Sequence, residues 1–216
     1  MNPDRDPSSE SDATMATEDL NRFVHELGHL KQSARTGWWL AGVKQPETVA
    51  EHSFRTAALA YFLAIQEGAN AEHTAILALF HDATEARLGD IPSVGQKYLD
   101  KPDEDKVAWD QVNGVPLSIV QAYTSSISEF RERATPEARL AHDADKLECL
   151  AQAVEYAAHG YPRARDWVSA SRDAVESETG RAMAAAMCDG DPDRWWADFV
   201  ANYRSAGTVS GPDGSL

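Results

Sequence analysis

The chain has 216 residues, of which 43% are hydrophobic and 25% are charged, and its formal net charge at pH 7 is −15. This length is typical of one domain with a sizeable core. The acidity argues against a nucleic-acid polymer or an anionic membrane as partner, because both bind through clustered Lys and Arg. A small anionic substrate would need local positive charge or a bound metal to reverse the field at its site.

The sequence contains no apolar run near the ~20 residues that cross a bilayer, and its start lacks the order of a signal peptide. These features predict a cytoplasmic protein. Cys149 and Cys188 are too few for a disulfide framework and show no CxxC spacing, so we predict reduced thiols and no structural zinc knuckle.

Both ends of the chain have compositions typical of disordered tails. Residues 1–16 are rich in Asp, Ser, Pro and Glu, and residues 205–216 combine Gly, Ser and Pro without an apolar period. The folded domain is therefore predicted to span residues 17–204.

Apolar residues recur with a helical period in four segments between these tails. The four stripes run over residues 20–30, 54–65, 75–83 and 140–154. Weaker helical patterns cover residues 103–113, 116–132, 163–186 and 192–203, the last with Pro192 suited to a first turn. Residues 35–46 are predicted to form a loop. Because strand alternation and hairpin signals are absent, we predict an all-α single domain without internal repeats.

Two of the seven histidines lie in the striped segments beside carboxylates, as Glu51-His52 and His81-Asp82. A single helical histidine is more often an ordinary hydrogen-bonded group than a metal ligand. The His81-Asp82 pair is more informative, because imidazole and carboxylate together suit Zn, Mn, Fe and Co. A buried carboxylate in an apolar helix is also costly unless a cation compensates it. Asp145, beside the apolar stripe of another helix, is a further inward-pointing candidate.

The pattern of a His, then His-Asp, then a distant Asp resembles that of the HD-domain metal-dependent phosphohydrolases. Within them, the strings ETVAEHSFR and HDATEARLGDIP are similar to blocks of the YfbR-like 5'-deoxynucleotidase and HD domain-containing protein 2 group. RTGWWLAGV and the run from Gln152 to Tyr156 resemble further blocks of the second group. The resemblance covers about residues 18–160. It implies an HD-domain helical bundle with the metal site between core helices, and a homodimer.

The resemblance also implies a set of site residues. One divalent ion, which could be Co, Mn, Zn, Fe or Ni, would be held by His52, His81, Asp82 and Asp145. Glu85 lies four residues after His81, which predicts the same helical face and a role as general acid or base. Asp90, in the turn after that helix, is the second predicted catalytic carboxylate.

Arg35 and Trp38 match the phosphate-contacting loop of the resembled group in residue type, and Lys97 is a further candidate cation. Arginine suits this task because its planar fork donates two parallel hydrogen bonds to a phosphate. Structural alternatives remain open: Arg35 can complement a helix dipole, and Trp38 can pack against the core. In the bacterial nucleotidase of the group the arginine directly precedes the tryptophan, whereas here it stands three residues earlier.

Between Asp82 and Asp145 the chain offers only one extra histidine, His142. This scarcity favours a single ion over the dinuclear site of HD-type oxygenases.

The function implied by the resemblance is a 5'-nucleotidase-type phosphomonoester hydrolase acting on (deoxy)nucleoside 5'-monophosphates. Two alternatives stay open. One is a phosphatase for a specialised nucleotide or nucleoside-analogue monophosphate in a biosynthetic pathway. The other is a catalytically silent HD module that binds nucleotide and regulates a partner. A cyclic-nucleotide phosphodiesterase or an alarmone hydrolase fits the length and the RTGW loop less well.

Overall fold

The computed structural model describes residues 7–206, with side chains described over residues 15–203. All elements of this part of the chain are helical, which confirms the predicted all-α class. An isolated antiparallel bridge joins Ala34 to Thr48. Within the same residues no helix combines the length and apolarity needed to cross a bilayer. Cys149 and Cys188 are free thiols, as predicted.

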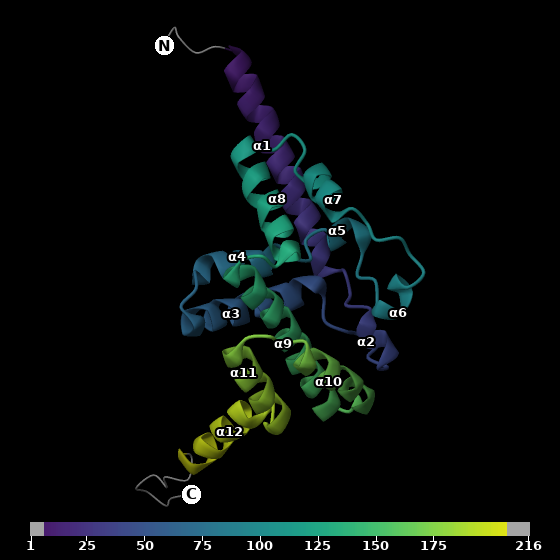
Figure 1. Ribbon diagram of the computed structural model, residues 1–216, viewed down its shortest axis with the longest axis vertical. Helices are drawn as coiled ribbons and strands as arrows, with labels where there is room; N and C mark the ends of the chain where they lie inside the picture. The colour runs from purple at the N-terminus through teal and green to yellow at the C-terminus, as the bar shows by residue number, and fades with distance from the viewer. Residues whose placement is uncertain (1–6, 207–216) are drawn as a thin grey trace, which may run out of the picture.

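The elements follow one another along the chain as drawn in Figure 1. The first half contains α1 (Pro7–Gly28), the 3-10 helix η1 (His29–Lys31), α2 (Gly37–Leu40), α3 (Val49–Glu67), α4 (Ala71–Phe80), α5 (Glu85–Leu88) and α6 (Ser93–Gln96). The second half contains α7 (Glu104–Gln111), α8 (Leu117–Glu132), α9 (Pro136–Ala158), the 3-10 helix η2 (Pro162–Arg165), α10 (Asp166–Asp173), α11 (Glu178–Asp189) and α12 (Arg194–Ala206).

Helix α1 begins at Pro7, inside the predicted N-terminal tail, so residues 7–16 of that segment are helical. Proline suits a first helical turn, and no Gly or Pro interrupts the chain between residues 8 and 27. At the other end α12 continues to Ala206, two residues into the predicted C-terminal tail. Residues 1–6 and 207–216 of the two predicted tails lie outside the described residues.

The helical pattern over residues 163–186 is divided among η2, α10 and α11 rather than continuous. The buried Asp143 carboxylate accepts hydrogen bonds from the backbone N–H groups of Glu176 (2.8 Å) and Ser177 (2.7 Å). Ser177 in turn caps α11 by accepting from the N–H of Gly180. These contacts give hydrogen-bond acceptors to the backbone N–H groups between α10 and the first turn of α11.

Helix α9 lies at the centre of the molecule and contacts α3, α4, α8, α10 and α11 (Figure 1). The largest apolar cluster forms where α9 meets α3, α4 and α11. Its fully buried leucines are Leu63, Leu77, Leu147 and Leu150. This packing places the middle of α9 directly beside the start of α3 and the end of α4, which is where the candidate site residues lie.

Two smaller clusters complete the core. In one, Phe23 of α1 packs edge-on against Tyr123 of α8, with ring centroids 4.9 Å apart. In the other, Trp38 of α2 packs against Tyr156 and Trp167. Helices α1 and α12 lie at opposite ends of the molecule (Figure 1).

Replacing Leu63 by Ala is expected to lower the free energy of unfolding by about 2–5 kcal/mol, because it leaves a cavity in the main cluster. Urea denaturation measures this change. The same substitution at the exposed Leu117 is the matched control, and it should cost only about 0.5 kcal/mol or less. Equal losses at the two positions would contradict the assignment of Leu63 to the core.

Candidate active site

The start of α3 places His52 in the interior. Thr48 and Glu51 form a capping box, in which the Thr48 hydroxyl accepts from the N–H of Glu51 and the Glu51 carboxylate accepts from the N–H of Thr48. This cap begins α3 immediately before His52, whose side chain is fully buried. The structure therefore places this candidate ligand in the interior.

The His81-Asp82 pair lies one residue beyond α4, in the turns that connect α4 to α5, rather than inside a helix. The N–H of Ala83 donates to the carbonyl of Phe80 and that of Glu85 to the carbonyl of Asp82, each at 3.0 Å. These three-residue spacings tighten the chain after α4. The expectation that Glu85 follows His81 on one continuous helical face is therefore wrong, although the turns still bring both side chains to one cavity.

Four side-chain donors from three elements meet in one place. His52 Nε2 lies 3.3 Å from His81 Nε2 and 3.3 Å from Asp145 Oδ1. Asp82 Oδ2 lies 3.1 Å from His81 Nε2 and 3.7 Å from His52 Nε2. Donors that share one ion at bond lengths of about 2.0–2.1 Å lie roughly 3–4 Å apart, depending on the coordination angle, so these separations suit a common metal ion. His52, His81 and Asp82 thus form one potential metal-binding group, and Asp145 Oδ1 adjoins it at 3.3 Å from His52 Nε2 and 3.9 Å from His81 Nε2.

The hydrogen bond made by Nδ1 of each histidine determines which ring nitrogen carries the proton. His81 Nδ1 lies 2.6 Å from the carbonyl oxygen of Ala78, which can only accept, so this nitrogen carries the proton. His52 Nδ1 lies 2.5 Å from Oε2 of Glu148. Each Nε2 is thereby the nitrogen that faces the carboxylates, and it can bind a metal once its own proton is lost.

The charges around these donors favour a cation. Burial alone would raise the pKa of Asp82, but the charge and hydrogen bond of His81, followed by the charge of Arg35, hold it well below its usual range. Burial and Arg35 lower the pKa of His52, yet hydrogen bonds to Asp145 and Glu148 outweigh them and raise it to about 10. The negative charges that hold this proton on His52 also attract a metal ion, and the ion displaces the proton when it binds. The residues therefore fit a divalent metal.

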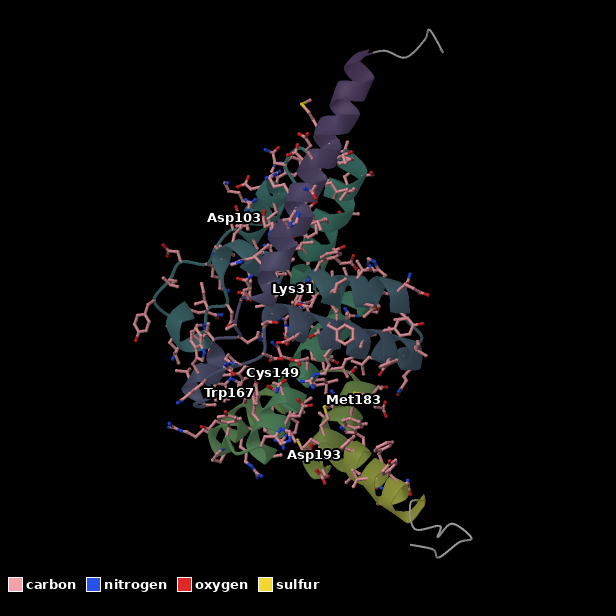
Figure 2. The ribbon with its side chains drawn as sticks, turned by 180° about the vertical axis from the view of Figure 1, so that it is seen from behind. Lys31, Asp103, Cys149, Trp167, Met183 and Asp193 are labelled. Atoms are coloured by element: carbon pink, nitrogen blue, oxygen red, sulfur yellow. The ribbon has the colours of Figure 1, made fainter. Side chains whose placement is uncertain are left out.

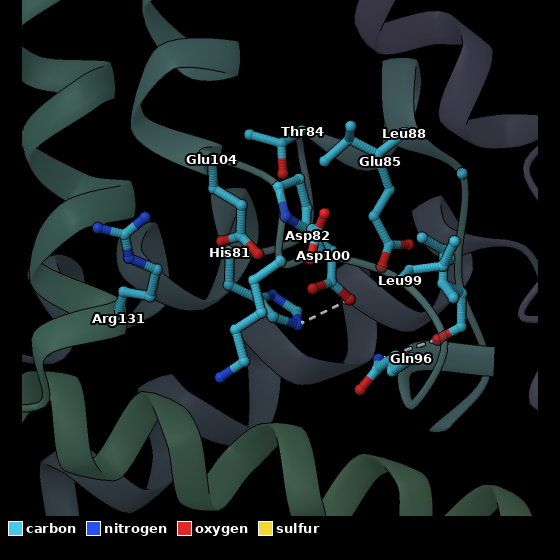
Figure 3. A pocket seen from close by; sticks show the side chains of 14 residues that line it. His81, Asp82, Thr84, Glu85, Leu88, Gln96, Leu99, Asp100, Glu104 and Arg131 are labelled. Carbon is cyan, nitrogen blue, oxygen red and sulfur yellow. Dashed lines mark hydrogen bonds and ion pairs between the residues drawn. The ribbon is translucent and has the colours of Figure 1, made fainter. Parts of the chain in front are cut away.

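Glu85 projects into the cavity beside these donors (Figure 3). Its Oε2 is buried and has no hydrogen-bond partner among the described residues. Burial, followed by the charges of Asp82 and Asp90, raises the pKa of Glu85 to about 9. A carboxyl group in this environment holds its proton near neutral pH and can donate it to a reacting oxygen.

Asp90 follows Gly89, whose φ of +71° is readily adopted only by glycine. Both the backbone N–H and the hydroxyl of Thr36 donate to Asp90 Oδ2, and the Thr36 hydroxyl is also 2.9 Å from the Asp90 carbonyl oxygen. The carboxylate is thus engaged with the loop that carries Arg35. This geometry favours a positioning role for Asp90 over proton transfer.

Arg35 lies at the metal centre, where its guanidinium NH1 is 3.2 Å from Asp82 Oδ2. Its backbone N–H donates to the carbonyl of Glu47 at 2.9 Å, which ties the loop to the residues before α3. Burial lowers the pKa of Arg35, but the charges of Asp82 and Asp145 outweigh burial and raise it. Arg35 therefore stays cationic at the edge of the donor cluster.

The other two predicted phosphate contacts are placed differently. Trp38 is 2% exposed and its indole N–H donates to Glu47 Oε1 at 2.9 Å, so the structure favours the core-packing alternative for it. Lys97 is exposed after α6 and lines neither of the two cavities at the metal centre. A lysine that does line one of these cavities is Lys146, whose Nζ is 2.7 Å from Asp145 Oδ2.

Lys146 and Glu148 are the site residues that the sequence reasoning missed. Lys146 directly follows Asp145, and Glu148 lies four residues after Ala144 on the apolar stripe of α9. A fully buried glutamate in such a stripe signals a compensating partner, here His52. His142 belongs to neither of the potential metal-binding groups found among the described residues.

Two cavities meet at the donor cluster. One of about 530 Å³ is lined by His81 and Glu85 and also by Glu104 and Arg131, which lie to the left of Glu85 in Figure 3. The other, of about 480 Å³, contains Arg35 and Lys146, and its wall includes Cys149 and Trp167 (Figure 2). Both cavities are lined by Asp82, Glu85, Ile91 and Gln96. The Glu85 carboxyl therefore lies where the two cavities join.

Comparison with known proteins agrees with this arrangement. The zebrafish (Danio rerio) protein 5'-deoxynucleotidase HDDC2 is 33% identical over 142 residues, covering 64% of this chain and 70% of the relative. The human protein of the same name is 30% identical over 139 residues, covering 63% and 68%. The Schizosaccharomyces pombe 5'-deoxynucleotidase hdd1 is 29% identical over 140 residues, covering 62% and 70%.

Solved structures share the fold. A predicted metal-dependent phosphohydrolase from Magnetospirillum magnetotacticum aligns with a TM-score of 0.63 at 27% identity, covering 81% of this chain and 92% of that chain. A conserved hypothetical protein from Pyrococcus furiosus aligns with a TM-score of 0.64 at 32% identity, covering 76% and 95%. A family model described as HD domain matches residues 27–186, well over half of the sequence. This chain therefore belongs to the HD domain family.

Proposed function

We propose that this protein is a metal-dependent phosphohydrolase that releases phosphate from nucleoside 5'-monophosphates, with a preference for deoxyribonucleotides. The observation that carries the proposal is the convergence of His52, His81, Asp82 and Asp145 beside a protonated Glu85 and the cation of Arg35. The relatives named 5'-deoxynucleotidase support the substrate class. Homodimerisation, which the family resemblance implies, stays a prediction.

In this proposal the four donors hold one divalent ion. When bound, the ion supplies Lewis-acid polarisation of a phosphate oxygen and lowers the pKa of water. The protein's own cations act on the same group: Arg35 and Lys146 line one cavity and place positive charge where the phosphate carries its negative charge. This local positive charge offsets the repulsion that a chain of net charge −15 would otherwise exert on an anionic substrate.

Glu85 moves the proton. The oxygen of a water forms a bond to phosphorus as the bond from phosphorus to the nucleoside 5'-oxygen breaks. The leaving 5'-oxygen takes the proton that Glu85 holds, and the carboxylate then recovers a proton from the attacking water. Asp90 keeps Thr36, and with it the backbone beside Arg35, in place during the reaction.

A substrate panel tests the proposal. Apo protein reconstituted with Co²⁺, Mn²⁺ or Zn²⁺ is incubated with deoxyribonucleoside and ribonucleoside 5'-monophosphates, nucleoside 3'-monophosphates and cyclic nucleotides, and released phosphate is measured. We expect turnover of the 5'-monophosphates, fastest for the deoxy forms, and none of the cyclic compounds. Absence of turnover of any 5'-monophosphate with all three metals would contradict the proposal.

The same panel separates the alternatives. A specialised phosphatase would hydrolyse one modified 5'-monophosphate with a kcat/KM far above that of the common nucleotides. A silent regulatory module would bind nucleotide in calorimetry without releasing phosphate. Oε2 of Glu85, buried and without a hydrogen-bond partner among the described residues, argues against the silent module, because binding alone gives no reason to retain so costly a group.

A further inference from the structure

A charged network lies behind His52, on the side away from the other metal donors. Glu148 of α9 is fully buried, and its Oε2 is 2.5 Å from His52 Nδ1. Its Oε1 is 2.9 Å from Nε and 2.8 Å from NH2 of Arg55 on α3. Both oxygens of this carboxylate are thus used, one by the histidine and one by the guanidinium fork.

Arg55 is itself held from α9. Its NH1 donates to Glu155 Oε1 at 2.6 Å and its NH2 to Gln152 Oε1 at 2.9 Å. Glu148, Gln152 and Glu155 recur at helical spacing on one face of α9, opposite His52 and Arg55 at i and i+3 of α3. The contacts therefore run continuously from the partly exposed Arg55 to the imidazole of His52.

A fully buried carboxylate is costly unless charge and hydrogen bonds compensate it. Arg55 supplies the opposite charge at one oxygen of Glu148, and His52 supplies a hydrogen-bond partner at the other. An ionised acceptor at Nδ1 keeps the proton on that nitrogen, fixes the ring orientation and makes Nε2 a stronger donor to a metal.

We propose that Glu148 and Arg55 are positioning residues that set the affinity of the site for its divalent ion by holding His52 with Nε2 toward Asp82 and Asp145. The inference rests on the metal site of the proposed function. It assigns no contact with substrate to either residue.

The test is the affinity of the full-length apo protein for Co²⁺, measured without substrate by competition with a chromogenic chelator. Glu148→Gln keeps the shape of the side chain but removes its charge, and we expect Kd to rise by about 10- to 100-fold. The visible absorption bands of the bound Co²⁺ should also change, because the donor geometry at His52 changes. A wild-type Kd and spectrum in this variant would overturn the proposal.

Glu155→Gln is the matched control. It removes a carboxylate from the same face of α9 that also bonds Arg55 but does not reach His52, so Kd and the spectrum should stay at wild-type values. A loss as large as that of Glu148→Gln would show a general charge effect and would overturn the positioning role.

Glu148 is buried, so a second variant keeps the test decisive if Glu148→Gln does not fold. Arg55→Lys retains the positive charge but loses the two-bond fork, and its effect on the ion comes from position rather than charge. We expect Kd to rise on the order of 3- to 10-fold, with an altered spectrum. An unchanged Kd and spectrum in folded Arg55→Lys would count against the proposal.

These measurements are separate from the test of the proposed function. Loss of Co²⁺ affinity in Glu148→Gln supports the positioning role even if no monophosphate is hydrolysed. Conversely, hydrolysis of deoxyribonucleotides by a wild-type protein whose variants keep full Co²⁺ affinity would leave the function standing and overturn only this inference.

Discussion

Replacing Asp82 by Ala is expected to abolish stoichiometric metal binding and to lower phosphate release by about 10³-fold or more, because the lost donor contacts both histidines of the cluster. Elemental analysis of the purified, reconstituted variant measures the metal content. The substitution also removes the partner of Arg35, so thermal unfolding should be recorded to show that the variant is folded.

The matched control for Asp82→Ala is Asp143→Ala. Asp143 is a buried carboxylate on α9, two residues before Asp145, but it binds the backbone N–H groups of Glu176 and Ser177 instead of the metal donors. This control should lose stability and keep its metal. Full metal content in Asp82→Ala would contradict the assigned ligand set, and loss of metal in both variants would show that the effect follows from destabilisation alone.

Glu85→Gln is expected to lower kcat for nucleoside 5'-monophosphates by about 10²- to 10⁴-fold while metal content and KM change little. The amide cannot donate a proton as the carboxyl does. The loss should be much smaller with p-nitrophenyl phosphate, whose phenolate leaves without needing a proton. An equal loss on both substrates would contradict the assignment of Glu85 as the acid for the leaving oxygen.

The pH profile gives the same assignment an independent check. The pKa of Glu85 is raised to about 9, so the protonated form predominates at neutral pH and is lost as pH rises. A bound cation favours the carboxylate and lowers this value, so the alkaline fall in kcat is expected at or below pH 9. Glu85→Gln should lack that limb of the profile.

Glu104→Gln is the control for Glu85→Gln. Burial also raises the pKa of Glu104, which lines the same cavity at the end near Arg131 (Figure 3). Because Glu104 belongs to no potential metal-binding group found among the described residues and does not line the cavity that contains Arg35, its replacement should keep kcat within a few-fold of wild type and preserve the alkaline limb. A kcat loss as large as that of Glu85→Gln would show that any carboxylate in the cavity matters equally.

Much of the fold could be predicted from the sequence because helices are encoded locally. The apolar stripe over residues 54–65 and the box formed by Thr48 and Glu51 specify α3 from neighbouring residues alone. The break near residue 176 could not be predicted in this way. It depends on Asp143, more than 30 residues earlier, whose carboxylate satisfies the backbone there.

The candidate site also combines features visible in the sequence with features that depend on the tertiary structure. The sequence by itself determined the all-α class, and its resemblance to the HD-domain phosphohydrolases singled out His52, His81, Asp82 and Asp145 as candidate ligands. Only the tertiary structure decided that Trp38 packs inside, that Lys97 stays outside, and that Lys146 takes the place at the cavity.

The tertiary structure also decided the tasks of the acidic residues. Asp90 and Glu85 are both carboxylates near the donor cluster, yet Asp90 is bound to Thr36, whereas Oε2 of Glu85 is buried without a partner among the described residues. Glu148 contacts His52 only because α9 packs against α3. The physical reason is that a pKa and a set of hydrogen bonds depend on which distant segments surround a group, and the order of residues along the chain does not contain that information.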